Sequence, residues 1–180
     1  MTICGAILAG GRSRRFGGDK AEALLDGKRL IDRVAEALSG QVDVLVICGR
    51  EESRHRCLED WPEPGLGPLG GLAAALHFAE RESHDAVLSV GCDIPNLPGT
   101  LLDQLRGAGP GIADSQPVIG YWPVALSPLL DAFIAKGGRA LYAFAEAAGG
   151  RRIAIDPPLA NINRPADLEK FARRSSRQDR

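Results

Sequence analysis

Glycines and basic residues gather in residues 8–20, which read LAGGRSRRFGGDK. Four glycines fall within nine residues, and three arginines and a lysine are interspersed with them. Glycine permits positive φ angles and lets the backbone come close to a ligand. Such a loop presents backbone N–H groups to an anion, and the basic side chains add full charges. The segment therefore indicates a phosphate site, and it suits a nucleoside triphosphate.

Two common phosphate-binding motifs do not match this segment. Lys20 follows Asp19 and precedes Ala21, so the P-loop pattern GxxxxGK[ST] is absent, as is the GxGxxG spacing of dinucleotide-binding loops. A polar loop whose charges are merely solvated is the alternative. Residues 8–20 directly follow an apolar stretch, and Arg15 and Lys20 flank a pair of glycines, which favours the interpretation as a phosphate site.

Asp93 follows another apolar stretch, residues 86–91. A carboxylate at the carboxyl end of a strand can hold Mg²⁺ against a triphosphate, because Mg²⁺ is usually bound by one or two carboxylates together with phosphates and water. An Asx turn or a helix cap ahead of Pro95 would explain the residue equally well by itself. Beside the basic, glycine-rich segment, the magnesium interpretation is favoured.

Two further segments place polar groups at predicted helix starts. Glycines in residues 65–71 open a helix whose free N–H groups could face a ligand, although a tight turn needs the same glycines. Asn161 and Asn163 precede the last helix and could contact a second substrate. Their spacing alone favours a cap by Asn163, with Asp167 as an acid in the first turn.

The elements that would position these residues alternate along the chain. Apolar runs predict buried strands at residues 2–8, 43–48 and 86–91, and apolar residues at helical spacing predict helices at 30–38 and from about 70 to 81. Buried strands separated by helices predict an α/β fold, in which a doubly wound, mostly parallel sheet lies between two helical layers. Ligands bind such sheets at the carboxyl ends of the strands, which points to the segments after Leu8, Cys48 and Gly91.

The second half of the chain is less regular. Residues 116–125 predict an edge or bulged strand, because Gly120 and Pro123 interrupt it. Ser127 reads as a helix cap, with Pro128 at the first helical position. The other expected elements are helices at 100–106 and 139–148, a strand at 152–155, a helix from Pro165 and a frayed tail at 173–180. No repeat or linker interrupts residues 1–180, so we expect a single domain.

Composition excludes several function classes. The chain has 180 residues, is 44% hydrophobic and carries a net charge of −1, which disfavours a general nucleic-acid or membrane-surface binder. The four cysteines lack metal-binding spacing, and most of them lie in apolar runs, as reduced core thiols do. With no signal peptide and no membrane-spanning stretch, we expect a cytoplasmic protein. The three histidines share no catalytic spacing, and His77 reads as a residue at the edge of the core.

Taken together, the segments LAGGRSRRFGGDK, GPLGGL, CDIP, GYWPV and NINRPADL resemble the molybdenum cofactor guanylyltransferase (MobA-type) family, in order along nearly the whole chain. The resemblance implies a Rossmann-like nucleotidyltransferase fold. It further implies transfer of GMP from GTP to molybdenum-loaded molybdopterin, with release of pyrophosphate and with Mg²⁺ as cofactor. Molybdoenzymes or their chaperones would receive the product.

The resemblance also assigns residues. Backbone contacts to the guanine nucleotide fall to Leu8, Ala9, Gly10 and Gly11. The phosphates would be faced by Arg15, Gly18 and Lys20, with Arg15, Lys20 and Asp93 as the catalytic set. By the same resemblance, Asp93 would bind magnesium, and Asp60 would be an acid that contacts the nucleotide. The pterin substrate would be bound by Asn161 and Asn163.

The chain departs from the family pattern at three places. Phe16 replaces a methionine, which is a tolerable apolar exchange. Ile47 stands where some members have a nucleotide-contacting asparagine. Arg164 replaces a threonine cap, a loss of about 1 kcal/mol unless Asn163 takes over the capping, and it could alternatively face the pterin phosphate. The alternatives are a CTP-dependent transferase acting on molybdopterin or a sugar phosphate, and a non-catalytic molybdopterin carrier.

Overall fold

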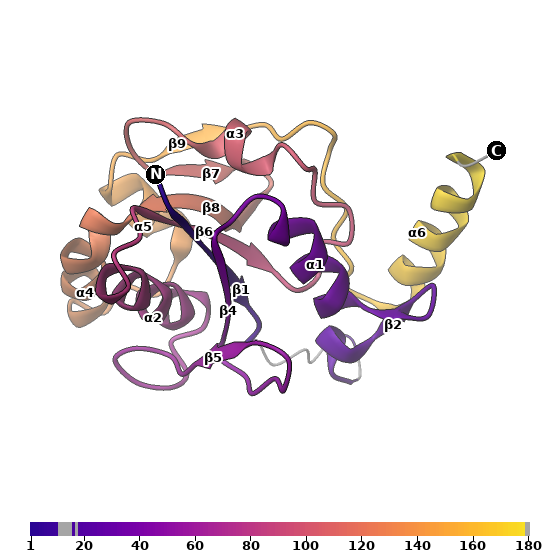
Figure 1. Ribbon diagram of the computed structural model, residues 1–180, viewed down its shortest axis with the longest axis horizontal. Coiled ribbons are helices and arrows are strands. Elements are labelled where there is room, and N and C mark those ends of the chain that lie inside the picture. The colour runs from indigo at the N-terminus through magenta and orange to yellow at the C-terminus, as the bar shows by residue number, and fades with distance from the viewer. Residues whose placement is uncertain (11–15, 17, 179–180) are drawn as a thin grey trace.

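The computed structural model describes residues 1–10, 16 and 18–178, with side chains described as far as Arg173. Gly11 and Arg15, two of the predicted site residues, lie outside this set. A mostly parallel sheet forms the middle layer, and helices pack on both of its faces (Figure 1). The predicted three-layer α/β fold is therefore confirmed.

Over the described residues the main sheet has seven strands in the order β5-β4-β1-β6-β8-β7-β9. Of these strands β8 runs antiparallel to both of its neighbours, and the rest are parallel to one another. The strands are β1 (Ile3–Leu8), β4 (Val44–Cys48), β5 (Arg56–Leu58), β6 (Ala86–Gly91), β7 (Gly111–Ala113), β8 (Gln116–Pro123) and β9 (Arg151–Ile153).

The helices divide between the two faces of the sheet. One face packs against α2 (Pro68–Arg81), α4 (Ser127–Ala135) and α5 (Leu141–Ala147). The other packs against α1 (Leu30–Ser39) and α3 (Leu101–Leu105). Two short 3₁₀ turns, a two-stranded hairpin and a C-terminal helix complete the described elements: η1 (Lys20–Glu22), η2 (Val124–Leu126), β2 (Leu24–Leu25), β3 (Lys28–Arg29) and α6 (Pro165–Gln178).

The central strand β1 is buried at every position, which explains its continuous apolar sequence. Cys4 and Ala6 join the core under α2, whereas Ile3 and Ile7 join the core under α1. No helix in the described part of the chain is both long and apolar enough to cross a membrane.

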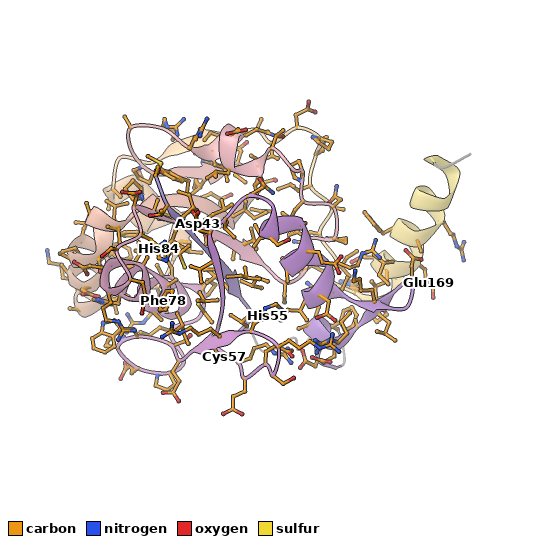
Figure 2. The ribbon with its side chains drawn as sticks, in the orientation of Figure 1. Asp43, His55, Cys57, Phe78, His84 and Glu169 are labelled. Atoms are coloured by element: carbon orange, nitrogen blue, oxygen red, sulfur yellow. The ribbon has the colours of Figure 1, made fainter. Side chains whose placement is uncertain are left out.

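Two aspartates set the register of β1. The Ile3 N–H donates to Asp43 Oδ2 at 2.6 Å, and the Thr2 N–H donates to Asp85 Oδ2 at 2.6 Å. Asp43, labelled in Figure 2, precedes β4, and Asp85 precedes β6. The resulting register pairs Leu8 with both Cys48 and Gly91, so the carboxyl ends of all three strands lie level.

The prediction for residues 116–125 is partly wrong. β8 is not an edge strand, because it pairs with β6 on one side and β7 on the other. The bulge is confirmed, since the register with β7 shifts beside Ile112 and Ala113. Gly120 is explained by packing: a Cβ there would lie 2.8 Å from the Trp122 ring.

Other boundaries differ in detail from the predictions. α2 begins at Pro68, and α4 begins at Ser127 itself, so that Leu126 is at the cap position and the Ser127 hydroxyl lies 3.5 Å from His77 Nδ1. The final helix, α6, extends from Pro165 through Gln178. The strands β5 and β7 and the β2–β3 hairpin, in which every strand has three residues or fewer, were not predicted from the sequence.

The loops after β1 and β4 touch through two glycines. Gly49 has φ +80°, and a Cβ added to it would lie 2.6 Å from Gly10 Cα. The Ala9 N–H donates to Cys48 O at 2.9 Å, which extends the pairing of the two strands into these loops. Glycine is therefore required at position 49 by both conformation and space.

We expect Gly49→Ala to lower the free energy of unfolding by about 2–4 kcal/mol, from a strained left-handed conformation together with overpacking. Gly27→Ala is the matched control, since Gly27 has φ +78° but nothing near its Cβ position. The control should lose only about 1–2 kcal/mol. Urea denaturation measures both values, and equal losses would show that the Gly10 contact is unimportant.

Candidate functional site

Three predicted site residues from distant parts of the chain meet in one contact. Lys20 Nζ donates to Asp93 Oδ2 at 2.7 Å and to Asn163 Oδ1 at 3.1 Å. The Lys20 side chain is 10% exposed and that of Asp93 is 21% exposed, so solvent screens this ion pair little. The fold thus joins the end of the glycine-rich segment, the end of β6 and the segment before α6.

Each partner is positioned by its own backbone. Asp19 caps η1, because its Oδ1 accepts the Ala21 N–H at 3.1 Å, and this turn carries Lys20. The Ile162 N–H donates to Asp93 O at 3.0 Å. Ile162 is buried in a small apolar cluster with Leu25 and Leu30, which anchors the segment that carries both asparagines.

The expected helix cap by Asn163 is wrong. Asp167 Oδ2 accepts the backbone N–H groups of Asn163 at 3.0 Å and Arg164 at 2.8 Å, and these bonds lower the pKa of Asp167. The start of α6 is therefore satisfied by an acid in the first helical turn. This arrangement leaves the Asn163 side chain available to Lys20.

Asn161 lies on the other side of Ile162. Its Oδ1 is buried and has no hydrogen-bond partner within the described part of the chain. A buried polar atom without a partner costs about 1–3 kcal/mol, so such atoms are uncommon in folded proteins. An unsatisfied hydrogen-bond acceptor two residues before Asn163 is suited to a donor group of a ligand.

A pocket of about 410 Å³ opens where the loops after β1 and β4 meet. Ala9, Gly10 and Gly18, all predicted to bind the nucleotide, line it. Leu8 is buried at the end of β1, behind these residues. The remaining lining residues are Asp19, Gly49, Arg50 and Glu51.

Asp60 packs against Gly49 and the start of α2. A Cβ added at Gly49 would lie 3.2 Å from Asp60 Oδ1. A Cβ added at Gly70 would lie 2.9 Å from Asp60 Cβ. Burial raises the pKa of the Asp60 carboxyl, although a hydrogen bond from the Gly65 N–H opposes the shift. Asp60 therefore lies behind the loop that forms the pocket wall.

The glycines at the start of α2 have a packing role. The N–H groups of Gly70 and Gly71 both donate to Gly67 O, at 3.1 and 3.5 Å. A Cβ at Gly71 would lie 3.1 Å from Cys48 Cβ. These amides are thus already bonded, and the glycines let the helix approach Asp60 and β4 closely.

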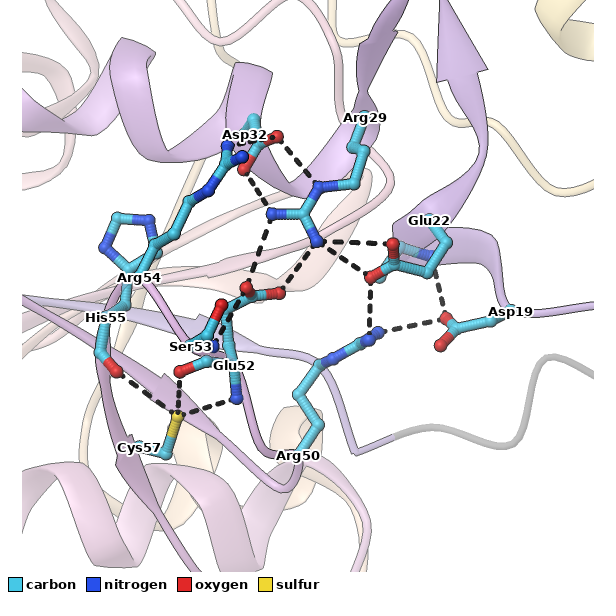
Figure 3. A network of polar contacts seen from close by, with 11 residues as sticks. Asp19, Glu22, Arg29, Asp32, Arg50, Glu52, Ser53, Arg54, His55 and Cys57 are labelled. Carbon is cyan, nitrogen blue, oxygen red and sulfur yellow. Dashed lines mark hydrogen bonds and ion pairs between the residues drawn. The ribbon is translucent and has the colours of Figure 1, made fainter.

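The segment after Cys48 was predicted to lie at the site, but its basic residue Arg50 was not singled out. Arg50 donates to Asp19 at 3.0 Å and to Glu22 at 2.9 Å, so it ties the β4 loop to η1 (Figure 3). Arg29 extends the network, and its ion pairs lower the pKa values of Asp32 and Glu52. The position of Arg50 at a strand end was the available signal.

Residues expected to be structural behave as such. His77 contacts Asp131 Oδ1 at 3.1 Å at the edge of the core. All four cysteines are free, and burial raises the pKa of the Cys4 thiol to about 12. Phe16 packs against the cluster of Leu25, as expected of an apolar exchange.

The chain is similar to a known protein family and to named relatives. Residues 5–156 match the family described as MobA-like NTP transferase domain. The molybdenum cofactor guanylyltransferase of Rhodobacter capsulatus is 37% identical over 181 residues, covering 94% of this chain and 95% of that protein. The chain belongs to the MobA-like NTP transferase family. The molybdenum cofactor guanylyltransferase of Cereibacter sphaeroides is 36% identical over 184 residues, with the same coverage.

This MobA-like NTP transferase also shares its fold with a solved structure. Molybdopterin-guanine dinucleotide biosynthesis protein A from Archaeoglobus fulgidus superposes with a TM-score of 0.76 at 23% identity, covering 98% of this chain and 100% of that one. The likeness establishes the Rossmann-like nucleotidyltransferase architecture predicted from the sequence. Membership of the MobA-like NTP transferase family makes the protein a nucleotidyltransferase. Its candidate site lies where ligands bind such sheets.

The raised pKa of Asp60 predicts a pH-dependent stability. Between the unfolded value of about 3.8 and the higher folded value, the folded state binds more protons, so the free energy of unfolding falls as pH rises through this range. We expect Asp60→Asn to gain stability relative to wild type at about pH 7 and to lose that advantage near pH 3.

Urea denaturation of wild type and Asp60→Asn at both pH values measures the difference. Glu59→Gln, at an exposed neighbouring position, controls for removal of one negative charge. An Asp60→Asn effect that is the same at the two pH values would contradict the explanation by burial.

Proposed function

We propose that the protein transfers GMP from GTP to molybdenum-loaded molybdopterin and releases pyrophosphate, as a molybdenum cofactor guanylyltransferase. The observation that carries the proposal is the contact of Lys20 with Asp93 and Asn163. It brings together a predicted phosphate ligand, a predicted magnesium ligand and a predicted acceptor ligand. Relatives named for this activity align with 94% of the chain.

The residues fit a magnesium ion that arrives with the nucleotide. No group of three His, Cys, Asp or Glu side chains within the described residues could hold a metal alone. Asp93 is one carboxylate, which suits Mg²⁺ bound mainly by phosphates and water. Lys20 donates to Asp93 Oδ2. The other carboxylate oxygen, Asp93 Oδ1, lies so close to Gly91 that a Cβ added to this glycine would be only 2.5 Å away. The metal would neutralise phosphate charge.

The protein's own groups position the nucleotide. The N–H groups of Gly10 and Gly18 at the pocket would face the phosphate chain, while Lys20 and Arg15 supply positive charge. The terminal phosphate of the acceptor attacks the α-phosphorus in line. The new P–O bond forms as the bond to the β-phosphate oxygen breaks. Catalysis then consists of positioning and charge stabilisation, without a covalent enzyme intermediate.

The segment before α6 would bind the substrate that receives GMP. Asn161 has a buried oxygen without a hydrogen-bond partner within the described residues, and Asn163 contacts Lys20 directly. A pterin substrate bound to these two amides would lie beside the lysine that holds the triphosphate. We therefore assign Asn161 and Asn163 to the pterin substrate.

The cellular setting is part of the proposal. Four free cysteines are typical of a reducing compartment, which supports a cytoplasmic location. The product would pass to molybdoenzymes or to chaperones that load them.

We expect pyrophosphate release with GTP and molybdenum-loaded molybdopterin in the presence of Mg²⁺, and little with CTP or ATP. The assay compares the three nucleotides with and without the pterin. Preference for CTP would indicate a cytidylyltransferase. Binding of the pterin without pyrophosphate release from any nucleotide would indicate a carrier, and either result would refute the proposal.

Asp93→Asn should lower turnover by roughly 10²-fold or more, the loss typical of removing one transition-state stabiliser. Asparagine keeps an oxygen for Lys20, so the fold should persist, as a thermal melt would show. Asp103→Asn is the control, because Asp103 is an exposed residue paired only locally with Arg106. Near-normal magnesium-dependent turnover of Asp93→Asn would overturn the metal assignment.

A further inference from the structure

Arg50 is the basic residue in the lining of the 410 Å³ pocket, as far as the described residues show. It follows Gly49, whose positive φ turns the chain at the end of β4. Its side chain is only 18% exposed, and both terminal nitrogens are held by carboxylates from the opposite loop. The pocket therefore contains a fixed guanidinium beside the glycines Gly10 and Gly18.

One hydrogen-bonding group of Arg50 is unused. Its Nε is buried and has no acceptor within the part of the chain that the structure describes. The two carboxylates that hold the guanidinium, those of Asp19 and Glu22, are about half exposed, at 53% and 43%. A buried donor without an acceptor is unfavourable, and partners at the surface are easily exchanged. Arg50 is thus arranged to accept a new anionic partner.

Arg50 is joined to the short turn that carries Lys20. Asp19 and Glu22, whose carboxylates hold the Arg50 guanidinium, stand on either side of Lys20 in the sequence, at the cap and the end of η1. A triphosphate at the pocket would meet Lys20 beside Asp93 and Arg50 beside Asp19.

Arg29 provides a comparison within the same network. It pairs with Glu22, Asp32 and Glu52, and these bonds join η1, α1 and the β4–β5 loop (Figure 3). Its side chain is 21% exposed, close to the value for Arg50, but Arg29 does not line the pocket. Arg29 has the partners of a structural arginine, and Arg50 has in addition the position of a ligand contact.

We infer that Arg50 is a further nucleotide-binding residue, whose guanidinium exchanges a carboxylate partner for oxygens of the nucleotide's phosphate chain. Planar, bidentate donation by arginine suits phosphate oxygens. The inference deepens the proposed function, but it rests only on the part that places a nucleoside triphosphate in this pocket. It does not depend on which base or which acceptor the enzyme selects.

The test measures the affinity of guanosine, GMP, GDP and GTP for wild type, Arg50→Gln, Arg50→Lys and Arg29→Gln by calorimetry on the full chain. We expect Arg50→Gln to weaken GTP binding about 10- to 100-fold, the range for a lost charged hydrogen bond. Guanosine should bind Arg50→Gln and wild type equally well. Arg50→Lys should recover part of the affinity for GTP.

The control separates contact from structure. Arg29→Gln should lower the melting temperature and change the affinity for all four ligands by a similar, small factor. The inference is overturned if Arg50→Gln weakens guanosine as much as GTP, if it weakens neither, or if wild type binds no nucleoside triphosphate. A melting curve for each variant shows whether it is folded at the temperature of the measurement.

Failure of the proposed function gives a different result. If wild type prefers CTP or ATP, guanylyl transfer is refuted, and the same series is measured with the preferred base. A loss at Arg50→Gln that grows with the number of phosphates then still supports the inference. Whatever the base, the dependence on phosphate number should weaken in Arg50→Gln and stay as in wild type in Arg29→Gln.

Discussion

The largely buried ion pair between Lys20 and Asp93 is the contact on which the rest of the site depends. An ammonium and a carboxylate that are mostly removed from water require mutual charge compensation. Their segments are therefore held together before any substrate binds. Asn163 Oδ1 accepts a hydrogen bond from the same ammonium group, so the segment before α6 is tied to η1 through one nitrogen atom. Displacing either Lys20 or Asp93 would leave the charge of the other poorly compensated.

The fold supplies this contact by aligning strand ends. Asp43 and Asp85 fix the register of β1 at its start, which places Leu8 level with Cys48 and Gly91 at its end. The glycine pair at positions 10 and 49 then lets two loops touch. The carboxylates that hold Arg50 come from Asp19, near the end of the glycine-rich segment, and from Glu22 in η1. Two aspartates at the amino ends of the strands thus help to align the carboxyl ends, where the site lies.

Much of this could be predicted from the sequence, because it depends on local pattern. Buried strands have continuous apolar runs, and the rule that ligands bind at strand ends places Lys20 and Asp93 together. Three features could not be predicted because tertiary contacts decide them. Arg50 is oriented by Asp19 and Glu22. The Asn163 side chain contacts Lys20, while Asp167 accepts the backbone N–H groups that precede α6. β8 is central because β7 and β9 pair beyond it. The β2–β3 hairpin was missed despite its Asp26-Gly27 turn, since two-residue strands have no periodicity.

The single reversed strand has a consequence for how the enzyme is divided. Because β8 runs antiparallel to its neighbours, β9 again points toward the edge where β1, β4 and β6 end. The chain leaving β9 therefore arrives at the site from the far half of the sheet, carrying Asn161 and Asn163. There the segment packs through Ile162 against Leu25 and Leu30, which belong to the first half of the chain. Under the proposed function, substitutions in the segment after β9 would therefore alter the choice of pterin substrate without changing the strands that carry the nucleotide residues.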